Sequence, residues 1–286
     1  MKVFTINLYD YFGLEKPENS AGNLTCYITN RAKEYGANRL RPAMLVIPGG
    51  AYAYCSAREA EPVALKFLTQ GYCSFVLDYS PSPFRYPTQH REAGMAMAYI
   101  RKEAENFGIR TDNVCAIGFS AGGHLCGCLA TMYDSPVLDI LGEDKPLVKP
   151  DACALMYPVV IYGEKGHNWS FNNICGDDED LKNSISLEKC VTEKSVPAYI
   201  FSTVGDKAVP CKNSLALACA YEDKGVPFSL HIYEKGSHGL SVNDITSDKA
   251  SVLETRLPGT AEDYNQWVGQ VTNWLKERGF AVLDNE

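Results

Sequence analysis

The chain lacks any apolar run long enough to cross a membrane, which excludes a helical membrane span. Its first residues, Met1 to Asp10, also lack the long apolar core and the small-residue cleavage site of a signal peptide. We therefore expect a first strand at this end, no membrane partner and a cytoplasmic location.

Basic residues are too few to balance the acidic ones. The sequence has 27 Lys and Arg against 35 Asp and Glu, a formal net charge of −8, and the charges are dispersed. This excess of negative charge excludes nucleic acid as a natural partner. Repeats, low-complexity tracts and linkers are also lacking, so we expect a single domain over residues 1–286. A homo-oligomer stays open, because sequence does not show which apolar side chains are exposed.

The sequence also lacks a cysteine pattern that would indicate disulfides or a metal site. The eleven cysteines are odd in number and scattered, and the pair Cys126 and Cys128 has no second pair at ligand spacing. We expect free thiols in a reducing compartment, no metal and no organic cofactor. Most of these cysteines lie in apolar segments and are expected to be buried: Cys73, Cys115, Cys126, Cys128, Cys153 and Cys219.

Short apolar runs alternate with longer helical patterns along the chain. Runs that are apolar on both parities are typical of parallel strands covered on both faces. The sequence therefore predicts an α/β protein with a doubly wound, mostly parallel eight-stranded sheet and helices on both faces. The first two strands have no helical pattern between them and are expected to form an antiparallel edge. The predicted strands are Val3–Leu8, Leu24–Thr29, Ala43–Ile47, Cys73–Tyr79, Val114–Gly118, Ala152–Tyr157, Ala198–Thr203 and Phe228–Tyr233.

Two helices and one insertion stand out. Apolar spacing predicts a helix that Thr88 caps and that runs to Phe107, and a last helix from Tyr264, capped by Thr260. Residues 159–196 break the strand–helix rhythm and carry the acidic run 177–180. We interpret this segment as a lid-like insertion and its acidic run as a solvated turn.

A G-x-S-x-G pattern is the most informative motif. It spans Gly118 to Gly122, follows an apolar strand and precedes a helical stretch. A sharp strand-to-helix turn of this kind exposes a strained serine, Ser120, as a nucleophile.

A serine hydroxyl needs a base, and the base needs an acid that fixes its tautomer. Asp206 and His238 each follow a late strand, where parallel strands bring reacting groups to one edge of the sheet. The order Ser120, Asp206, His238 is the one expected of a nucleophile-elbow hydrolase.

The other histidines are less suitably placed. His231 lies within a strand, and His124 in the first turn after the serine is expected to be structural. His90 and His167 do not follow late strands, although either could line a pocket. Two acidic residues remain as fallbacks for Asp206, namely Asp177 and Asp178.

Acyl transfer also needs donors aimed at the developing oxyanion. The backbone N–H of Ala121 follows the nucleophile at the start of a helix. A second donor is expected from the loop after the third strand, residues 47–52, where Gly49 and Gly50 let backbone amides face a pocket.

Together these segments resemble the α/β-hydrolase-fold esterases, and among them the bacterial acetyl-xylan-esterase-like proteins. The resemblance spans roughly residues 40 to 240 and includes the stretch from Asp78 to Pro87. The segments that carry it are Pro48–Tyr52, Gly118–His124, Gly205–Pro210 and His238–Leu240.

The resemblance implies Ser120 as nucleophile, His238 as base and Asp206 as its partner. It also implies that the oxyanion amides belong to Gly50, Ala51 and Ala121. Hormone-sensitive-lipase relatives have His where this chain has Pro48 and Gly where it has Ala51. A proline at this position is typical of the acetyl-esterase-like branch.

The reaction that follows is hydrolysis of a short acyl ester, and the resemblance implies acetyl groups on sugars or oligosaccharides. Tyr52, Tyr54 and Trp169 are candidate walls of the substrate pocket, with ordinary packing as the alternative. Three competing functions stay open: a small-substrate amidase or formamidase, a serine peptidase of the prolyl-oligopeptidase kind, and a non-catalytic ligand-binding homologue. The peptidases usually carry a large N-terminal propeller, for which this chain has no room.

Overall fold

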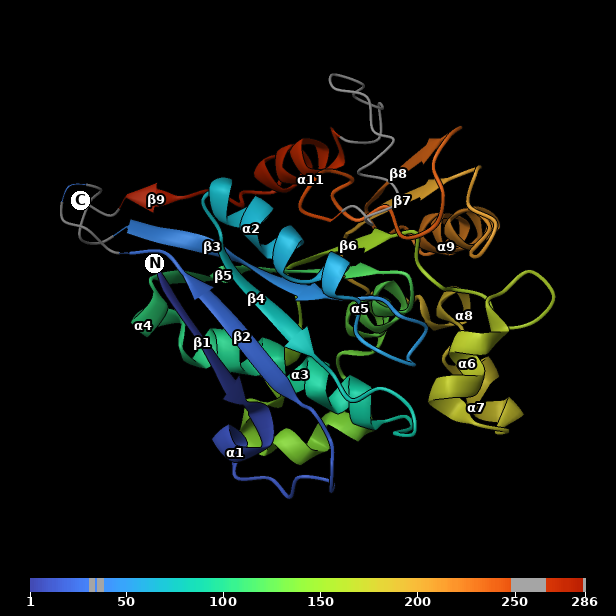
Figure 1. Ribbon diagram of the computed structural model, residues 1–286, viewed down its shortest axis with the longest axis horizontal. Helices are drawn as coiled ribbons and strands as arrows, with labels where there is room; N and C mark the ends of the chain where they lie inside the picture. Colours follow the sequence, from blue (N-terminus) through green and yellow to red (C-terminus); the bar gives the residue numbers. More distant parts are fainter. Residues whose placement is uncertain (31–33, 35–38, 248–265, 285–286) are drawn as a thin grey trace.

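A single twisted sheet runs through the protein in the computed structural model, which describes residues 1–30, 34, 39–247 and 266–284 (Figure 1). Its order is β1-β2-β4-β3-β5-β6-β7-β8, and β9 pairs with β3. The strands are β1 (Lys2–Asn7), β2 (Asn23–Ile28), β3 (Arg39–Ile47), β4 (Cys73–Asp78), β5 (Ile109–Phe119), β6 (Ala152–Met156), β7 (Ala198–Thr203), β8 (Phe228–Tyr233) and β9 (Leu283–Asp284).

The eight predicted strands are all present, and the sheet is mostly parallel, as predicted. Strand β2 runs antiparallel to both β1 and β4, whereas β3 to β8 are parallel to one another, so the antiparallel edge is confirmed. Strand β9 has two residues, which are too few to form a sequence pattern. The expectation of no helix between β1 and β2 was wrong, since α1 (Leu8–Phe12) lies there, capped by Asn7 and ended by Gly13.

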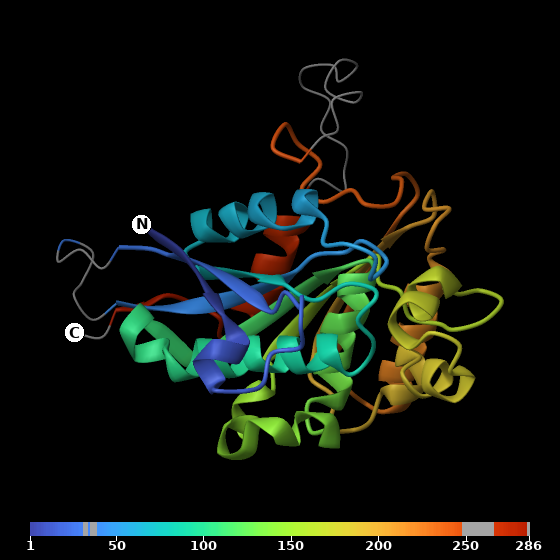
Figure 2. The same cartoon turned by 60° about the horizontal axis from the view of Figure 1, so that its bottom comes forward.

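Helices cover both faces of the sheet (Figure 2). The longer ones on one face are α3, α5 and α9, and the opposite face carries α2 and α11. The helices are α1, α2 (Glu61–Thr69), α3 (Thr88–Lys102), α4 (Ala104–Phe107), α5 (Ala121–Met132), α6 (Asn168–Cys175), α7 (Glu179–Ser184), α8 (Leu187–Cys190), α9 (Lys212–Asp223) and α11 (Trp267–Lys276), with the 3₁₀ segments η2 (Ala57–Glu59) and η3 (Pro136–Val148).

Strand β3 shows why both faces must be covered. Leu45 packs into the core under α3 and α5, while its neighbours Met44 and Val46 pack into the core under α2 and α11. All three side chains are fully buried. Successive side chains of a strand point to opposite faces, so the run of apolar residues fills two cores at once.

Helix boundaries differ from the prediction at three points. Thr88 is the first residue of α3 and makes no side-chain cap, because Pro87 takes the cap position. One helix was predicted to run to Phe107, but α3 ends at Lys102. The residues up to Phe107 form the separate short helix α4. Thr260 and Tyr264 lie outside the described residues.

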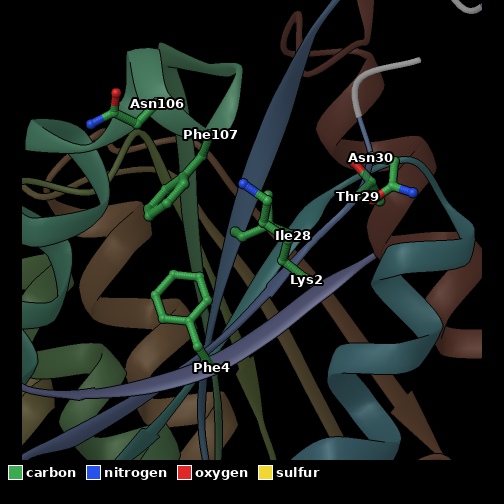
Figure 3. Close-up of a pocket in the computed structure, with 7 residues that line it drawn as sticks. All are labelled: Lys2, Phe4, Ile28, Thr29, Asn30, Asn106 and Phe107. Carbon is green, nitrogen blue, oxygen red and sulfur yellow. The ribbon is translucent and has the colours of Figure 1, made fainter.

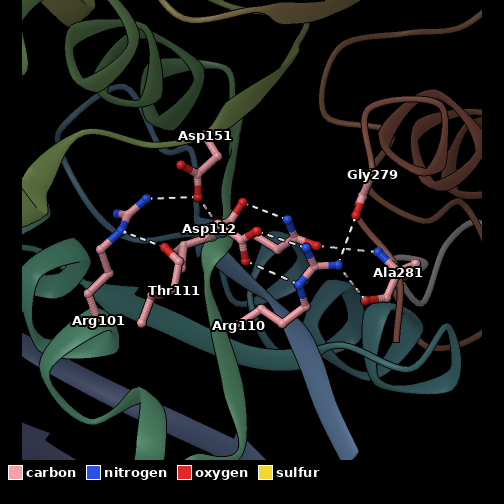
Figure 4. Close-up of polar contacts among 9 residues, drawn as sticks. Arg101, Arg110, Thr111, Asp112, Asp151, Gly279 and Ala281 are labelled. Atoms are coloured by element: carbon pink, nitrogen blue, oxygen red, sulfur yellow. Dashed lines mark hydrogen bonds and ion pairs between the residues drawn. The ribbon is translucent and has the colours of Figure 1, made fainter. Parts of the chain in front are cut away.

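Polar contacts tie the start of β5 to its neighbours (Figure 4). Arg101 of α3 forms an ion pair of 2.8 Å with Asp151, which precedes β6. Arg110 pairs with Asp112 and donates to the carbonyls of Gly279 and Ala281 after α11. These contacts hold β5 in an extended form well before the predicted start at Val114.

The segment 159–196 forms α6, α7 and α8 and lies at the end of the molecule toward which β3 points (Figures 1 and 2). Its acidic run is exposed, as expected of a solvated turn, and Asp178 caps α7 by accepting from the Leu181 amide at 2.9 Å. Whether the segment acts as a lid stays a prediction.

All eleven cysteines are free thiols, and most are buried as predicted. Cys219 was wrongly predicted to be buried, because it lies on the outer side of α9 and is exposed. Within the described ranges, no helix combines the length and the apolar character that a membrane crossing requires.

Candidate active site

The turn between β5 and α5 holds Ser120 in a strained conformation. Its φ of 54° and ψ of −117° lie in a region that non-glycine residues rarely adopt. A Cβ at Gly118 would lie 2.1 Å from the carbonyl oxygen of Gly122, and one at Gly122 would lie 2.2 Å from that of Ile47. Glycine at Gly118 lets β5 and α5 approach each other closely, and glycine at Gly122 lets α5 pack against the end of β3, which explains both glycines of the motif.

Ser120, His238 and Asp206 form a hydrogen-bonded chain, although they lie on three separate loops. The Oγ of Ser120 lies 2.7 Å from Nε2 of His238. The Nδ1 of His238 lies 2.6 Å from Oδ2 of Asp206. A proton on Nδ1 leaves Nε2 free to accept the serine proton, which is the arrangement that nucleophilic activation requires.

The turn after β7 fixes the carboxylate of Asp206. Its second oxygen, Oδ1, accepts from the backbone amides of Ala208 and Val209, both at 2.9 Å. Asp206 is only 3% exposed. With two polar contacts to the turn and one to His238, the carboxylate has one orientation toward the imidazole.

The backbone amides of Gly50, Ala51 and Ala121 have no hydrogen-bond partner in the part of the chain that the structure describes. Gly50 and Ala51 line the same cavity as Ser120, and Ala121 follows the serine directly. Gly50 has a φ of 122°, and a Cβ there would lie 2.0 Å from the carbonyl oxygen of Tyr54. Free donors in this setting are suited to an oxyanion.

The residue types around this loop hold it in place. The hydroxyl of Tyr79 donates to the Pro48 carbonyl at 3.0 Å. Asn173, in α6 of the insertion, donates from Nδ2 to the Ala51 carbonyl at 2.8 Å. The loop is therefore fixed on both sides of the free amides, and the insertion supplies one of the two contacts.

A cavity of about 410 Å³ opens above Ser120 and His238. Two of the predicted wall residues line it with exposed rings, since Tyr54 is 57% and Trp169 55% exposed. His167 lines it as well, and its Nδ1 lies 2.8 Å from the Ser170 hydroxyl. Burial and the nearby His238 lower the pKa of His167.

Tyr52 does not line this cavity, in contrast to its predicted place in the pocket wall. Its side chain is 1% exposed, and its hydroxyl lies 2.7 Å from Nδ1 of His124. The other nitrogen of His124 lies 2.8 Å from the Ile185 carbonyl. This agrees with the structural role expected of His124, and Tyr52 joins the loop after β3 to helix α5.

The remaining candidates lie outside the hydrogen-bonded chain. His90 is fully buried in α3, and His231 of β8 stacks on Tyr199 with ring centroids 4.6 Å apart. Asp177 and Asp178 are exposed at the start of α7, where Asp178 serves as a cap.

Two further residues lie at the site that the sequence did not predict, Glu59 and Tyr157. Glu59 lines the cavity, and the Tyr157 ring packs edge-on against His238 with centroids 5.2 Å apart. Glu59 lies among charged and small residues that resemble an exposed helix start, so the sequence contains no signal of its burial. Among the described residues, no three His, Cys, Asp or Glu side chains are grouped to hold a metal ion.

A second cavity, of about 740 Å³, lies far from this site, between β1, β2 and α4 (Figure 3). Phe4 and Phe107 form its apolar side, and Lys2 is its charged residue. The residues that line it include no serine, histidine or carboxylate. It therefore offers no groups for acyl transfer.

Comparison with known proteins identifies the family of this chain. The profile of the BD-FAE family matches residues 31–221. Endo-1,4-beta-xylanase B from Butyrivibrio fibrisolvens is 35% identical over 71% of this chain and 33% of its own length. An acetylxylan esterase from Xylanibacter ruminicola is 30% identical over 83% of this chain and 46% of its own length. The chain thus spans between a third and a half of these relatives.

One similar solved structure extends over nearly the full length of both chains. It is the acetyl ester-xyloside bifunctional hydrolase from Caldicellulosiruptor lactoaceticus, 30% identical, with 97% of each chain covered and a TM-score of 0.80. The predicted resemblance and the predicted fold are thereby confirmed. This protein belongs to the BD-FAE family and has the α/β-hydrolase fold.

Proposed function

We propose that the protein is a serine esterase that hydrolyses short acyl esters, foremost acetyl esters of sugars or oligosaccharides. The observation that carries the proposal is the hydrogen-bonded chain from Ser120 through His238 to Asp206. Beside it lie backbone amides that have no partner among the described residues. The names of the acetylxylan esterase and of the acetyl ester-xyloside hydrolase support acetyl esters as the substrate class.

The mechanism follows from the order of these groups. His238 takes the proton of Ser120 at Nε2 while Oγ attacks the ester carbonyl carbon, and Asp206 stabilises the resulting imidazolium. The amides of Ala121 and of Gly50 or Ala51 donate to the oxyanion. Collapse of the tetrahedral intermediate breaks the ester bond, and His238 returns its proton to the leaving alcohol.

Water then releases the acyl group. It enters where the alcohol left, gives a proton to His238 and attacks the acyl-Ser120 carbonyl. Collapse of this second intermediate returns the proton to Ser120 Oγ and frees the carboxylic acid. The same three residues and the same amides serve both half-reactions.

The shape of the cavity supports a short acyl group and a ring-shaped alcohol. Its volume of about 410 Å³ is at the small end for ligand sites. The exposed rings of Tyr54 and Trp169 at its wall are suited to stacking against a sugar ring.

The competing functions differ in whether they need the triad. An amidase, a formamidase or a peptidase would use the same triad with a nitrogen leaving group, so only a substrate panel separates them from an esterase. A non-catalytic homologue has no need for the aligned serine, histidine and aspartate or for strain at Ser120. The geometry therefore favours an enzyme over a binding protein.

Activity on a panel of esters and amides tests the proposal. The panel contains 4-nitrophenyl esters of increasing chain length, acetylated xylo-oligosaccharides, aminoacyl arylamides and N-formyl arylamides. We expect turnover of acetyl esters that falls with chain length and disappears in Ser120→Ala. Ser184→Ala, an exposed serine on α7, is the matched control and keeps full activity. Turnover of amides alone would contradict the proposal.

Three properties of this enzyme stay predictions from sequence. They are a cytoplasmic location, action without metal or organic cofactor, and the absence of nucleic-acid and membrane partners. Cell fractionation tests the first, and full activity after dialysis against a chelator tests the second.

A further inference from the structure

Glu59 is a buried carboxylate at the candidate active site that the proposed mechanism leaves without a role. It ends the 3₁₀ segment η2, lines the cavity and is 3% exposed. Burial raises its pKa, and hydrogen bonds to its two oxygens oppose this effect. Placing a carboxylate in such a site costs free energy unless it has partners, and here the two partners belong to different parts of the site.

The first partner is the oxyanion loop. The Gly49 amide donates to Oε2 of Glu59 at 2.9 Å. Gly49 is also packed against the nucleophile, because a Cβ there would lie 2.9 Å from Cβ of Ser120. The bond to Glu59 thus occupies the amide immediately before the free amides of Gly50 and Ala51. Its direction determines how the next peptide unit faces Ser120.

The second partner leads to the histidine loop. The hydroxyl of Tyr157 donates to Oε1 of Glu59 at 2.8 Å and accepts from the Ser241 amide at 2.9 Å. Ser241 lies three residues after His238, and the Tyr157 ring packs against the imidazole. The indole of Trp267 donates to the Ser241 carbonyl at 2.9 Å, which anchors this loop to α11.

We propose that Glu59 is a positioning residue that joins the oxyanion loop to the loop of His238. This inference rests on the proposed esterase function and deepens it. One carboxylate holds Gly49 on one side and, through Tyr157, Ser241 on the other. The donors for the oxyanion and the base that moves the proton are thereby held at a fixed separation.

The charge of Glu59 adds to this role. When His238 accepts the serine proton, an imidazolium forms beside a carboxylate buried in the same wall, and attraction in a site of low dielectric stabilises it. Among the described residues, the titratable and charged groups that face Glu59 are His238, Tyr157, Tyr79 and Arg58. Arg58 carries the opposite charge, and its Nε donates to the Ser247 carbonyl.

The test compares three variants with the wild-type enzyme. Glu59→Gln keeps the shape and removes the charge and one acceptor. Tyr157→Phe keeps the charge and removes the hydroxyl that joins Glu59 to the Ser241 amide. Glu61→Gln is the matched control, since Glu61 lies two residues along the chain and is exposed on α2. For each protein we would measure kcat and KM on 4-nitrophenyl acetate, the rate of labelling by a fluorophosphonate, and Tm.

We expect Glu59→Gln to lower kcat and the labelling rate by about 10- to 100-fold, because the oxyanion donors are displaced but kept, whereas outright loss of a donor costs about 10²- to 10³-fold. KM should stay within about twofold. Tyr157→Phe should lower kcat less, and the double variant no more than the stronger single variant, because both changes interrupt one connection. Glu61→Gln should match the wild type. A merely structural role would move Tm without this split between kcat and KM.

Folded Glu59→Gln with kcat and labelling within twofold of the wild type would overturn the inference. If Glu59→Gln does not fold, Tyr157→Phe decides, and unchanged kcat in that variant overturns it as well. Failure of the proposed function has a different signature. A wild type that reacts with fluorophosphonate but hydrolyses no ester contradicts the esterase, while the labelling rates still test Glu59.

Discussion

The carboxylate of Asp206 meets the imidazole of His238 at 2.6 Å while its other oxygen holds two amides of its own turn. The carboxylate is thus oriented by the backbone amides on one side and meets the imidazole on the other. This arrangement separates two properties of Asp206 that a substitution can distinguish, its place in the turn and its charge toward the histidine.

Asp206→Asn should lower kcat by about 10⁴-fold with little change in Tm. The Asn oxygen can still accept from the amides of Ala208 and Val209, so the turn is kept. Its amide group would donate to Nδ1 and place the imidazole proton on Nε2, facing Ser120. Steady-state kinetics and thermal unfolding of the same preparation measure both effects.

Asp178→Asn is the control for that experiment. Asp178 caps α7 and has no contact with the histidine, so we expect near-normal turnover and a small loss of stability. The opposite result, with Asp178→Asn inactive and Asp206→Asn active, would transfer the role of the acid to the insertion.

Alanine should have opposite effects on stability at two helical glycines, Gly122 of α5, which packs against β3, and Gly269 of α11, which has open space beside it. Gly122→Ala should prevent folding or lower Tm strongly, since its Cβ would lie 2.2 Å from the Ile47 carbonyl oxygen and 2.3 Å from that of Pro48. Gly269→Ala in α11 meets nothing within 4 Å, and should stabilise by about 0.5–1 kcal/mol through helix propensity. Urea unfolding measures both, and equal effects of the two substitutions would contradict this view of the elbow.

Burial of His90 should make the free energy of unfolding depend on pH. Burial lowers its pKa to about 3, far below the value near 6.5 of an unfolded chain. The unfolded state therefore binds the proton first, and stability present above pH 6.5 is lost as the pH falls toward 3. The contribution is about 1.4 kcal/mol per pH unit within this window.

His90→Leu should remove this part of the slope and raise stability at pH 8. Neither ring nitrogen of His90 has a hydrogen-bond partner within the described ranges, which costs on the order of 1–3 kcal/mol. His124 is the contrast, because both of its nitrogens have partners, so His124→Leu should destabilise at the same pH. Urea unfolding at pH 5 and pH 8 gives the comparison. An unchanged slope in His90→Leu would contradict the account.

Trp169 should matter for oligosaccharide esters and little for small ones. Trp169→Ala removes a stacking surface worth about 0.5–1.5 kcal/mol, so KM for an acetylated xylo-oligosaccharide should rise by about 2- to 10-fold. KM for 4-nitrophenyl acetate should stay unchanged. Leu65→Ala, another exposed apolar residue but on α2, is the control. Equal changes in KM for both substrates would show that Trp169 does not recognise the sugar.

Much of this architecture could be predicted because its signals are local. Strands such as β7 are continuous apolar runs, and Asp206 and His238 stand on the loops directly after such runs. The turn at Ser120 needs glycine at Gly118 and Gly122, and this need appears directly in the sequence motif. For these features the sequence pattern and the fold depend on the same short segments.

Other features depend on contacts between distant segments, and sequence carried no sign of them. The position of Tyr52 on the loop after β3 suggests a pocket wall, but its ring turns inward and its hydroxyl meets His124 of α5. Glu59 looked like an exposed residue at a helix start, and its burial arises only when Gly49 and Tyr157 meet it. The two-residue strand β9 is set by its pairing with Arg39 and Leu40 alone.

The proposed reaction requires that Ser120 carries the acyl group during turnover. Mass spectrometry of the enzyme quenched with acid during turnover of 4-nitrophenyl acetate tests it most directly. We expect one acetyl group on the peptide that contains Ser120, and neither an acetyl adduct nor hydrolysis in Ser120→Ala. Ester hydrolysis that persists in Ser120→Ala, or an acetyl group found on another residue, would contradict it.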